Sequence, residues 1–232
     1  MSHKKILLTG ASRGIGYQTA LLLADQGHHV IAVARSFDKL QELSHKAPGK
    51  IIPIKTDLSD TEDISKLVKE VESLFQTVDV VIHNAGGIKV KPFEELTDDD
   101  WQYHLDINYL SAVKLYRGVL PLLDAGSHIL SISSMGGFQG ASKFTGLSAY
   151  SVSKGALTTL TECLATELSH REIAVNCLCL GAVQTEMLEK AFPGIKAPVS
   201  ASQMAEYIAE FGLTGHRFFN GKILPVALSD PE

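Results

Sequence analysis

Short apolar runs alternate with longer amphipathic segments along the whole chain, and this alternation constrains the fold most strongly. Seven runs are predicted to be strands: 5–9, 29–34, 51–55, 78–83, 128–133, 173–180 and 222–226. Most are apolar at nearly every position, which is typical of strands buried on both faces. Strands that alternate with helices predict a parallel sheet covered by helices on both sides. Because the 232 residues contain no repeat and no linker, we expect one doubly wound α/β domain over residues 1–232.

Helix-forming segments with recognisable ends lie between these runs. Four are expected, at 14–26, 60–75, 97–123 and 148–170. Gly27 suits the end of the first, Asp60 can cap the second, and Thr97 begins the third with acidic residues in its first turn. Such helices supply the crossovers that parallel strands require.

The charge balance excludes some partners. The chain has 21 Lys and Arg against 26 Asp and Glu, a formal net charge of −5, and carries no run of like charge. A nucleic-acid partner is therefore not expected. The N-terminal segment has too few consecutive apolar residues for a signal peptide, and no segment is long enough to span a membrane. We expect a cytoplasmic protein without a membrane partner.

The three cysteines, Cys163, Cys177 and Cys179, give an odd count, which argues against a disulfide framework. Cys177 and Cys179 alternate along a predicted strand and therefore point to one face. Small buried side chains are the favoured interpretation, and a reactive thiol or metal pair is the alternative. Because no His–Cys cluster surrounds them in the sequence, no metal site is expected.

The segment TGASRGIG, at 9–16, joins the first predicted strand to the first helix. Its three glycines allow the backbone to approach a pyrophosphate closely, and the following helix N-terminus attracts negative charge. The spacing differs from the older G-x-G-x-x-G dinucleotide pattern, but the physical requirement is the same. The residues of this turn expected to bind a dinucleotide are Gly10, Ser12, Arg13, Gly14, Ile15 and Gly16.

Arg35 lies directly after the second predicted strand, where an Asp or Glu would hydrogen-bond a ribose 2′-hydroxyl. An arginine there offers a cation to a 2′-phosphate instead, and Arg13 can supply a second cation. The alternative is that both arginines are solvated loop residues. The pattern favours NADP(H) over NAD(H) as the cofactor.

Tyr150 and Lys154 are four residues apart in a predicted helix and therefore project from one face. A nearby cation favours the tyrosinate and lowers the pKa of the phenol, and a positively charged nicotinamide ring would lower it further. The pair is predicted to make Tyr150 a proton donor and acceptor near neutral pH. Ser133 and Ser134 end a predicted strand, at the edge of the sheet where ligands bind, and a hydroxyl there can bond a substrate oxygen.

Five ordered motifs together resemble the short-chain dehydrogenase/reductase family. They are TGASRGIG at 9–16, HNAG at 83–86, DIN at 106–108, SISS at 131–134 and YSVSK at 150–154. The resemblance extends over nearly the whole chain. It implies a single Rossmann-type domain whose mostly parallel, seven-stranded sheet has the order 3-2-1-4-5-6-7, with a variable substrate segment at about 186–200.

The resemblance also implies roles for individual residues. Tyr150 would be the general acid/base and Lys154 would bind the nicotinamide ribose. Ser134 would orient the substrate carbonyl, and Asn108 would hold a water that joins Lys154 to solvent. The cofactor contacts beyond the glycine turn would be Arg35, Asp57, Leu58, Asn84, Ala85, Gly86, Tyr150, Lys154, Gly181, Val183 and Thr185.

The implied activity is reversible, NADP(H)-dependent hydride transfer between a carbonyl and an alcohol on a small or medium-sized substrate. Two other functions are open: an NADP-binding sensor or scaffold without turnover, and epimerisation or dehydration with a retained cofactor. The complete set of Tyr, Lys, Ser and Asn favours the oxidoreductase, because a sensor would keep the glycine turn and lose the acid/base residues.

Three positions depart from the family pattern. His83 replaces the first Asn of the usual NNAG, either with little consequence or with an added pH-sensitive role. Leu180 precedes Gly181 where the family usually has Pro, so the turn loses a fixed φ. Ser134 lies 16 residues before Tyr150, further than is usual, and the extra residues are expected to remodel the substrate mouth.

Two predicted helices carry apolar stripes beyond the needs of one core face. The stripes are Leu157, Leu160, Leu164 and Leu168 in one helix, and Leu105, Tyr109, Ala112, Val113 and Tyr116 in the other. One stripe can pack on the sheet, and family members commonly pair these helices with a second subunit. A homodimer or homotetramer is therefore expected. The variable segment offers a modest apolar lid made of Met187, Leu188, Phe192 and Ile195.

Overall fold

The seven apolar runs form one sheet in the computed structural model, which describes residues 3–228. The strands are β1 (Lys5–Thr9), β2 (His29–Ala34), β3 (Ile51–Lys55), β4 (Val80–His83), β5 (His128–Ser134), β6 (Ala174–Leu180) and β9 (Ile223–Val226). Their order is β3-β2-β1-β4-β5-β6-β9, and every neighbouring pair is parallel. The predicted Rossmann-type order is confirmed.

The seventh strand of the sheet is the ninth strand of the chain. Two short strands, β7 (Val183–Gln184) and β8 (Val199–Ser200), precede it and pair only with each other. They bracket the helix α7 (Glu186–Ala191). The segment at 181–200 therefore has secondary structure of its own.

The helices connect successive strands. They are α1 (Gly14–Asp25), α2 (Phe37–Lys46), α3 (Thr61–Phe75), α4 (Asp98–Leu105), α5 (Ser111–Val119), α6 (Ser148–Glu167), α7 and α8 (Ala201–Thr214). The caps are as predicted, since the Asp60 side chain accepts from two amides at the start of α3 and Thr97 forms a capping box on α4. The sequence did not identify α2, α7 or α8 as helices.

The expected long helix at 97–123 is not regular. A π-helical turn, Asp106–Leu110, separates α4 from α5, and a 3₁₀ turn follows at Leu120–Leu122. A π turn holds one residue more than an α turn and changes the direction in which the next side chains point. The interruption turns Asn108 into the protein, where it is fully buried.

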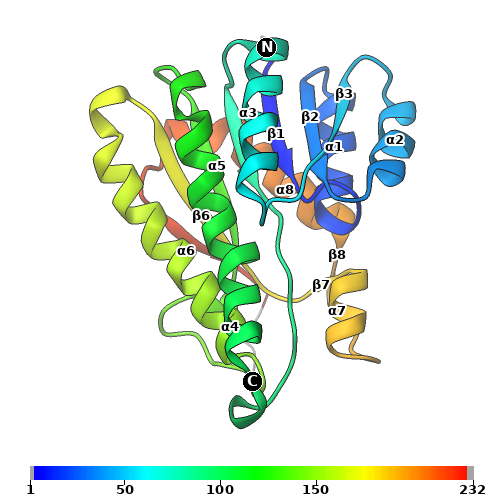
Figure 1. Ribbon diagram of the computed structural model, residues 1–232, viewed down its shortest axis with the longest axis vertical. Helices are drawn as coiled ribbons and strands as arrows, with labels where there is room; N and C mark the ends of the chain where they lie inside the picture. The colour runs from blue at the N-terminus through cyan, green and yellow to red at the C-terminus, as the bar shows by residue number, and fades with distance from the viewer. Residues whose placement is uncertain (1–2, 229–232) are drawn as a thin grey trace.

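The sheet separates two hydrophobic cores (Figure 1). On one face, α3, α5 and α6 cover a core that contains Leu7 and Ile129. On the other face, α1, α2 and α8 cover a core that contains Ile6 and Leu8. Adjacent residues of one strand thus enter opposite cores, which explains the continuous apolar runs in the sequence.

Ligand binding is favoured at one edge of this sheet. The chain reverses its direction of winding between β1 and β4, and ligands bind at such a switch point beside the carboxyl ends of the strands. In Figure 1, α7 and the start of α4 lie beyond this edge. Among residues 3–228, no helix is long and apolar enough to cross a membrane.

Candidate active site

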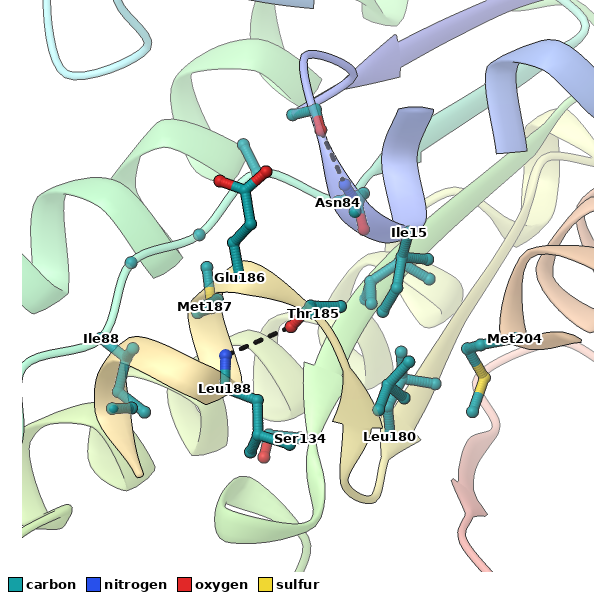
Figure 2. A pocket seen from close by; sticks show the side chains of 18 of the residues that line it. Ile15, Asn84, Ile88, Ser134, Leu180, Thr185, Glu186, Met187, Leu188 and Met204 are labelled. Atoms are coloured by element: carbon teal, nitrogen blue, oxygen red, sulfur yellow. Dashed lines mark hydrogen bonds between the residues drawn. The ribbon is translucent and has the colours of Figure 1, made fainter. Parts of the chain in front are cut away.

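A cleft of about 640 Å³ opens at the carboxyl edge of the sheet. Its walls come from the glycine turn, the ends of β2, β4, β5 and β6, the start of α6, and α7 (Figure 2). The predicted site residues that line it are Gly10, Ser12, Arg13, Gly14, Ile15, Arg35, Leu58, Asn84, Ala85, Gly86, Ser134, Tyr150, Lys154, Gly181, Val183 and Thr185. The fold therefore brings together segments that are far apart in the sequence.

The glycine turn has the backbone that a bound phosphate requires. Gly10 and Gly14 have φ of +69° and +56°, a region that L side chains rarely adopt. The Asn84 amide donates to the carbonyls of Thr9 (3.3 Å) and Gly10 (3.2 Å), so β4 fixes the shape of the turn (Figure 2). The turn is open on the cleft side, and the N-terminus of α1 faces it. These features fit the pyrophosphate of a dinucleotide.

The sequence predicts that Gly16 contacts the dinucleotide, but this residue lies away from the cleft surface. It is buried behind the turn and does not line the cleft. A Cβ at this position would overlap the carbonyl of Gly10 and the amide of Asn84. Its contribution is the close packing of α1 against the turn.

Positive charge gathers at one end of the cleft. Arg13, Arg35 and Lys39 line this end, together with the hydroxyl-bearing Ser36. The sequence analysis missed Lys39, although it stands four residues after Arg35 and thus one turn into α2. The guanidinium of Arg13 also lies 3.6 Å from the carboxylate of Glu186, which tethers α7 to the glycine turn.

Asp57 lies near Arg35, and its side chain is held by its own loop. Its Oδ1 accepts from the backbone amide (3.0 Å) and the hydroxyl (2.7 Å) of Ser59, and these bonds lower the pKa of the carboxyl. Leu58, the next residue, faces the cleft instead. The Asp57 contact with a cofactor stays a prediction, and the structure shows that the side chain also caps its own loop.

Tyr150 and Lys154 project from one face of α6 into the cleft, as their spacing predicts. Lys154 is 4% exposed, and its Nζ donates to the carbonyl of Ile132 on β5 at 2.9 Å. Burial lowers the pKa of Lys154 to about 8. The ammonium is thus held at the floor of the cleft and can exchange its proton near neutral pH.

The pKa of Tyr150 moves the other way. Burial raises it, and the Ser134 hydroxyl offsets this only in part. The net direction is therefore opposite to the lowering expected beside Lys154. The phenol stays protonated and ready to donate.

The two serines at the end of β5 have different partners. The Ser133 hydroxyl donates to the carbonyl of Lys154 at 2.9 Å and is buried. The Ser134 hydroxyl accepts from the backbone amide of Gly136 at 3.2 Å and lines the cleft, where it faces the phenol of Tyr150. Ser134 is the serine that can donate to a ligand beside Tyr150.

Asn108 lies behind the cleft rather than in its wall. Its Oδ1 accepts from the Gly87 amide at 2.8 Å, and its Nδ2 donates to the Gly87 carbonyl at 3.0 Å. A Cβ on Gly86 would lie 3.0 Å from Asn108 Oδ1 and 3.3 Å from Lys154 Nζ. The two polar groups thus flank Gly86, and only a glycine leaves both of them room.

Two of the three departures from the family pattern, at His83 and at Leu180, are explained by the contacts around them. His83 is fully buried, its Nε2 bonds the Ser111 hydroxyl at 3.0 Å, and burial lowers its pKa to about 3. It remains neutral near pH 7, which argues against an added pH-sensitive role. The amide of Gly181 donates to Val226 on β9 at 2.9 Å, so the turn after Leu180 is fixed without a proline.

The far end of the cleft is apolar. Residues from the longer loop before α6 and from α7 form much of it, as expected for both segments. The apolar side chains at this end are Ile88, Met135, Phe144, Leu147, Met187, Leu188, Ala191, Phe192 and Ile195. Figure 2 shows Leu188 projecting from α7, whose first turn is capped by the Thr185 hydroxyl at 3.2 Å from the Leu188 amide.

The cysteines have the favoured arrangement. Cys177 and Cys179 lie on one face of β6, are fully buried, and pack with Met135. Cys163 is exposed on α6. Both thiols are buried beneath the site. Burial and the hydrogen bond between the thiols raise the pKa of Cys177, and the same bond lowers the pKa of Cys179.

Comparison with known proteins identifies the family. The family profile described as short chain dehydrogenase matches residues 4–196. The chain belongs to the short-chain dehydrogenase/reductase family. Members of this family are oxidoreductases that use a nicotinamide dinucleotide, and the glycine turn and its open cleft fit such a cofactor.

Two bacterial proteins are similar in sequence to this short-chain dehydrogenase/reductase. An uncharacterized oxidoreductase of Listeria monocytogenes is 30% identical, over 100% of this chain and 93% of the relative. A 3beta-hydroxysteroid dehydrogenase of Mediterraneibacter gnavus is 32% identical, over 90% of this chain and 74% of the relative.

Two solved structures are similar throughout. A short chain dehydrogenase from Burkholderia cenocepacia in complex with NADP has a TM-score of 0.87 at 26% identity, covering 97% of this chain and 96% of that one. The L-sorbose reductase of Gluconobacter frateurii, complexed with NADPH and L-sorbose, has a TM-score of 0.86 at 26% identity, covering 99% and 97%.

Proposed function

We propose that this short-chain dehydrogenase/reductase is an NADP(H)-dependent enzyme that interconverts a carbonyl and an alcohol on a small or medium-sized, uncharged and largely apolar substrate. One observation carries the proposal: Ser134, Tyr150 and Lys154 line one cleft, between a phosphate-binding turn and an apolar wall. The proposal does not depend on which of the two directions is physiological.

The reaction assigned to the site divides between cofactor and protein. The nicotinamide, when bound, supplies or accepts the hydride. The Ser134 hydroxyl donates to the carbonyl oxygen and stabilises the charge that develops on it. Tyr150, protonated because burial raises its pKa, gives its proton to the same oxygen.

Lys154 has two tasks in this scheme. Its ammonium stabilises the tyrosinate that remains after proton transfer, and its pKa of about 8 allows it to pass a proton on. Asn108 and Lys154 both lie beside Gly86. The Asn108 amide also donates to the buried hydroxyl of Ser153 at 3.0 Å. We assign to Asn108 the support of this proton path.

The choice of NADP(H) rests on three cations. Arg13, Arg35 and Lys39 line the end of the cleft next to β2, where the adenosine ribose of a dinucleotide lies in this fold. A 2′-phosphate pairs with an arginine through charge-assisted, bidentate hydrogen bonds. Two structural neighbours were also solved in complex with NADP or NADPH.

The test compares the two cofactors directly. Wild type should oxidise NADPH with an apolar ketone or aldehyde at a higher kcat/KM than NADH. Arg35→Asp should reduce the kcat/KM for NADPH roughly 10- to 100-fold and leave the kcat/KM for NADH unchanged or higher, because a carboxylate at this position can hydrogen-bond the ribose 2′-hydroxyl. Arg217→Asp, at an exposed position outside the cleft, is the matched control. Equal kcat/KM for both cofactors in wild type would refute the NADP(H) assignment, and no turnover of any carbonyl would refute the function.

We also propose that two copies pair through α5 and α6. Part of each predicted stripe is used within the subunit, because Leu157, Leu168 and Tyr116 are buried in its own core. Leu160 and Leu164 are only partly buried, and Val152 is 53% exposed. Light scattering at micromolar concentration should give at least the mass of a dimer, and the mass of a monomer would contradict the pairing.

A further inference from the structure

Three polar residues, one helical turn apart, face the segment that leaves β4. They are Asp100, His104 and Asn108, at intervals of four along α4 and the π turn. Each bonds the chain at 87–91, here called the wall segment. Asn108 holds the segment at Gly87, through the two bonds described above.

Asp100 holds the other end of the wall segment. Its carboxylate accepts from Lys89 Nζ at 2.8 Å and from Lys91 Nζ at 2.6 Å. The carboxylate is itself buried, and these two cations hold the pKa of Asp100 far below its usual range. The Lys91 amide also donates to the carbonyl of Gly146 at 3.0 Å, which joins the segment to the loop before α6.

His104 occupies the middle of the row and is fully buried. Its Nδ1 lies 2.8 Å from the carbonyl of Asp100, which can only accept, so Nδ1 carries the proton. Nε2 is then unprotonated and accepts from the backbone amide of Lys89 at 3.1 Å. Both ring nitrogens are satisfied in one neutral tautomer, and the ring has one allowed orientation.

The His104 ring also contacts the tyrosine of the proposed active site. Its centroid lies 6.4 Å from that of Tyr150, with the ring planes at 75°, an edge-to-face arrangement. Ile88, which precedes Lys89 in the wall segment, lines the cleft and forms part of the apolar wall (Figure 2). One side chain therefore touches both the phenol and the segment that carries the wall.

We propose that His104 is a positioning residue: it fixes the distance between the substrate wall at Ile88 and the phenol of Tyr150. This inference rests on the proposed function. It predicts that the two contacts of the imidazole have separable effects. The bond to the Lys89 amide fixes the position of the wall segment, and the edge-to-face contact fixes the position of the Tyr150 ring. A residue that only fills space would not separate them.

Two substitutions separate the contacts. In His104→Phe the ring edge remains, but the Lys89 amide loses its acceptor. The KM for an apolar ketone should rise roughly tenfold, with kcat within about twofold of wild type. In His104→Gln an amide oxygen can still accept from Lys89, but the aromatic edge is lost. This variant should keep KM within about twofold while kcat falls roughly tenfold.

Amide hydrogen exchange supplies a readout that does not depend on turnover. His104→Phe should speed exchange at the wall segment roughly tenfold, and His104→Gln should leave it near the wild-type rate. The NADPH Kd should stay within about twofold of wild type in both variants. The matched control is His128→Phe, a fully buried histidine at the opposite end of β5, which should alter stability without altering exchange at 87–91.

The outcomes are distinguishable. Unchanged exchange at 87–91 in His104→Phe would overturn the inference whether or not any substrate is known. Parallel changes of KM and kcat in both variants would also overturn it, because they would indicate a space-filling role only. Failure of the wild type to reduce any carbonyl would instead refute the proposed function, and the exchange result would still decide whether His104 holds the wall segment.

Discussion

At the scale of the residue, the site depends on which of two adjacent serines is free. The Ser133 hydroxyl donates to the Lys154 carbonyl in α6, whereas the Ser134 hydroxyl faces the cleft. Ser134→Ala should therefore lower kcat roughly 10²- to 10³-fold with little change in NADPH Kd, because a donor to the developing oxyanion is lost. Steady-state kinetics and a cofactor titration check this.

Ser133→Ala provides the comparison for that prediction. It removes a buried bond to Lys154 and should lower the melting temperature while keeping most of the turnover. A larger loss of kcat in Ser133→Ala than in Ser134→Ala would contradict the assignment.

At the scale of the element, α7 is the part of the fold that closes over the apolar end of the cleft. Leu188→Asn removes an apolar contact and places an amide in its position. The KM for an apolar ketone should rise roughly tenfold, which corresponds to about 1–2 kcal/mol of lost burial, with NADPH Kd unchanged. Lys190→Asn, at an exposed position of the same helix, is the control. Improved turnover of a ketose in Leu188→Asn would support the apolar interpretation, and an unchanged KM would contradict it.

Elements differ in how well the sequence predicts them. The strands and the capped helices α3 and α4 follow from hydrophobic runs and side-chain caps, which are local signals. The Tyr150–Lys154 face follows from helical spacing alone. Two features do not: α7 is too short for a periodic pattern, and the π turn at Asn108 depends on contacts with Gly87 across the fold. The contacts of Lys39 and His104 also depend on residues that are distant in the sequence, so local patterns do not predict them.

At the scale of the whole molecule, buried histidines link stability to pH. His128 is fully buried, its two ring nitrogens bond Gly212 (2.9 Å) and Asn176 (3.1 Å), and burial lowers its pKa to about 4. In the unfolded chain a histidine has a pKa of about 6.5, so protons favour unfolding between these values. The stabilisation is complete above about pH 6.5 and is lost as the pH falls towards 4, with a total on the order of 3 kcal/mol.

Denaturant titrations from pH 7.5 to pH 4 measure this loss. The free energy of unfolding should be level above pH 7 and fall below pH 6.5, and His128→Gln should make the fall shallower. His170→Gln, at an exposed position, should reproduce the wild-type slope. A wild-type free energy that stays constant down to pH 4 would contradict the contribution of the buried histidines.

The central claim for the molecule is that a protonated phenol at the edge of the sheet completes the reduction of a carbonyl. The most direct measurement is NADPH-dependent ketone reduction by Tyr150→Phe, together with the NADPH Kd of the same variant. Because the ring and its packing remain while the proton is lost, kcat should fall roughly 10²- to 10⁴-fold and the Kd should stay within about twofold of wild type. Turnover above about a tenth of the wild-type rate, with the cofactor still bound, would show that the proton comes from another group.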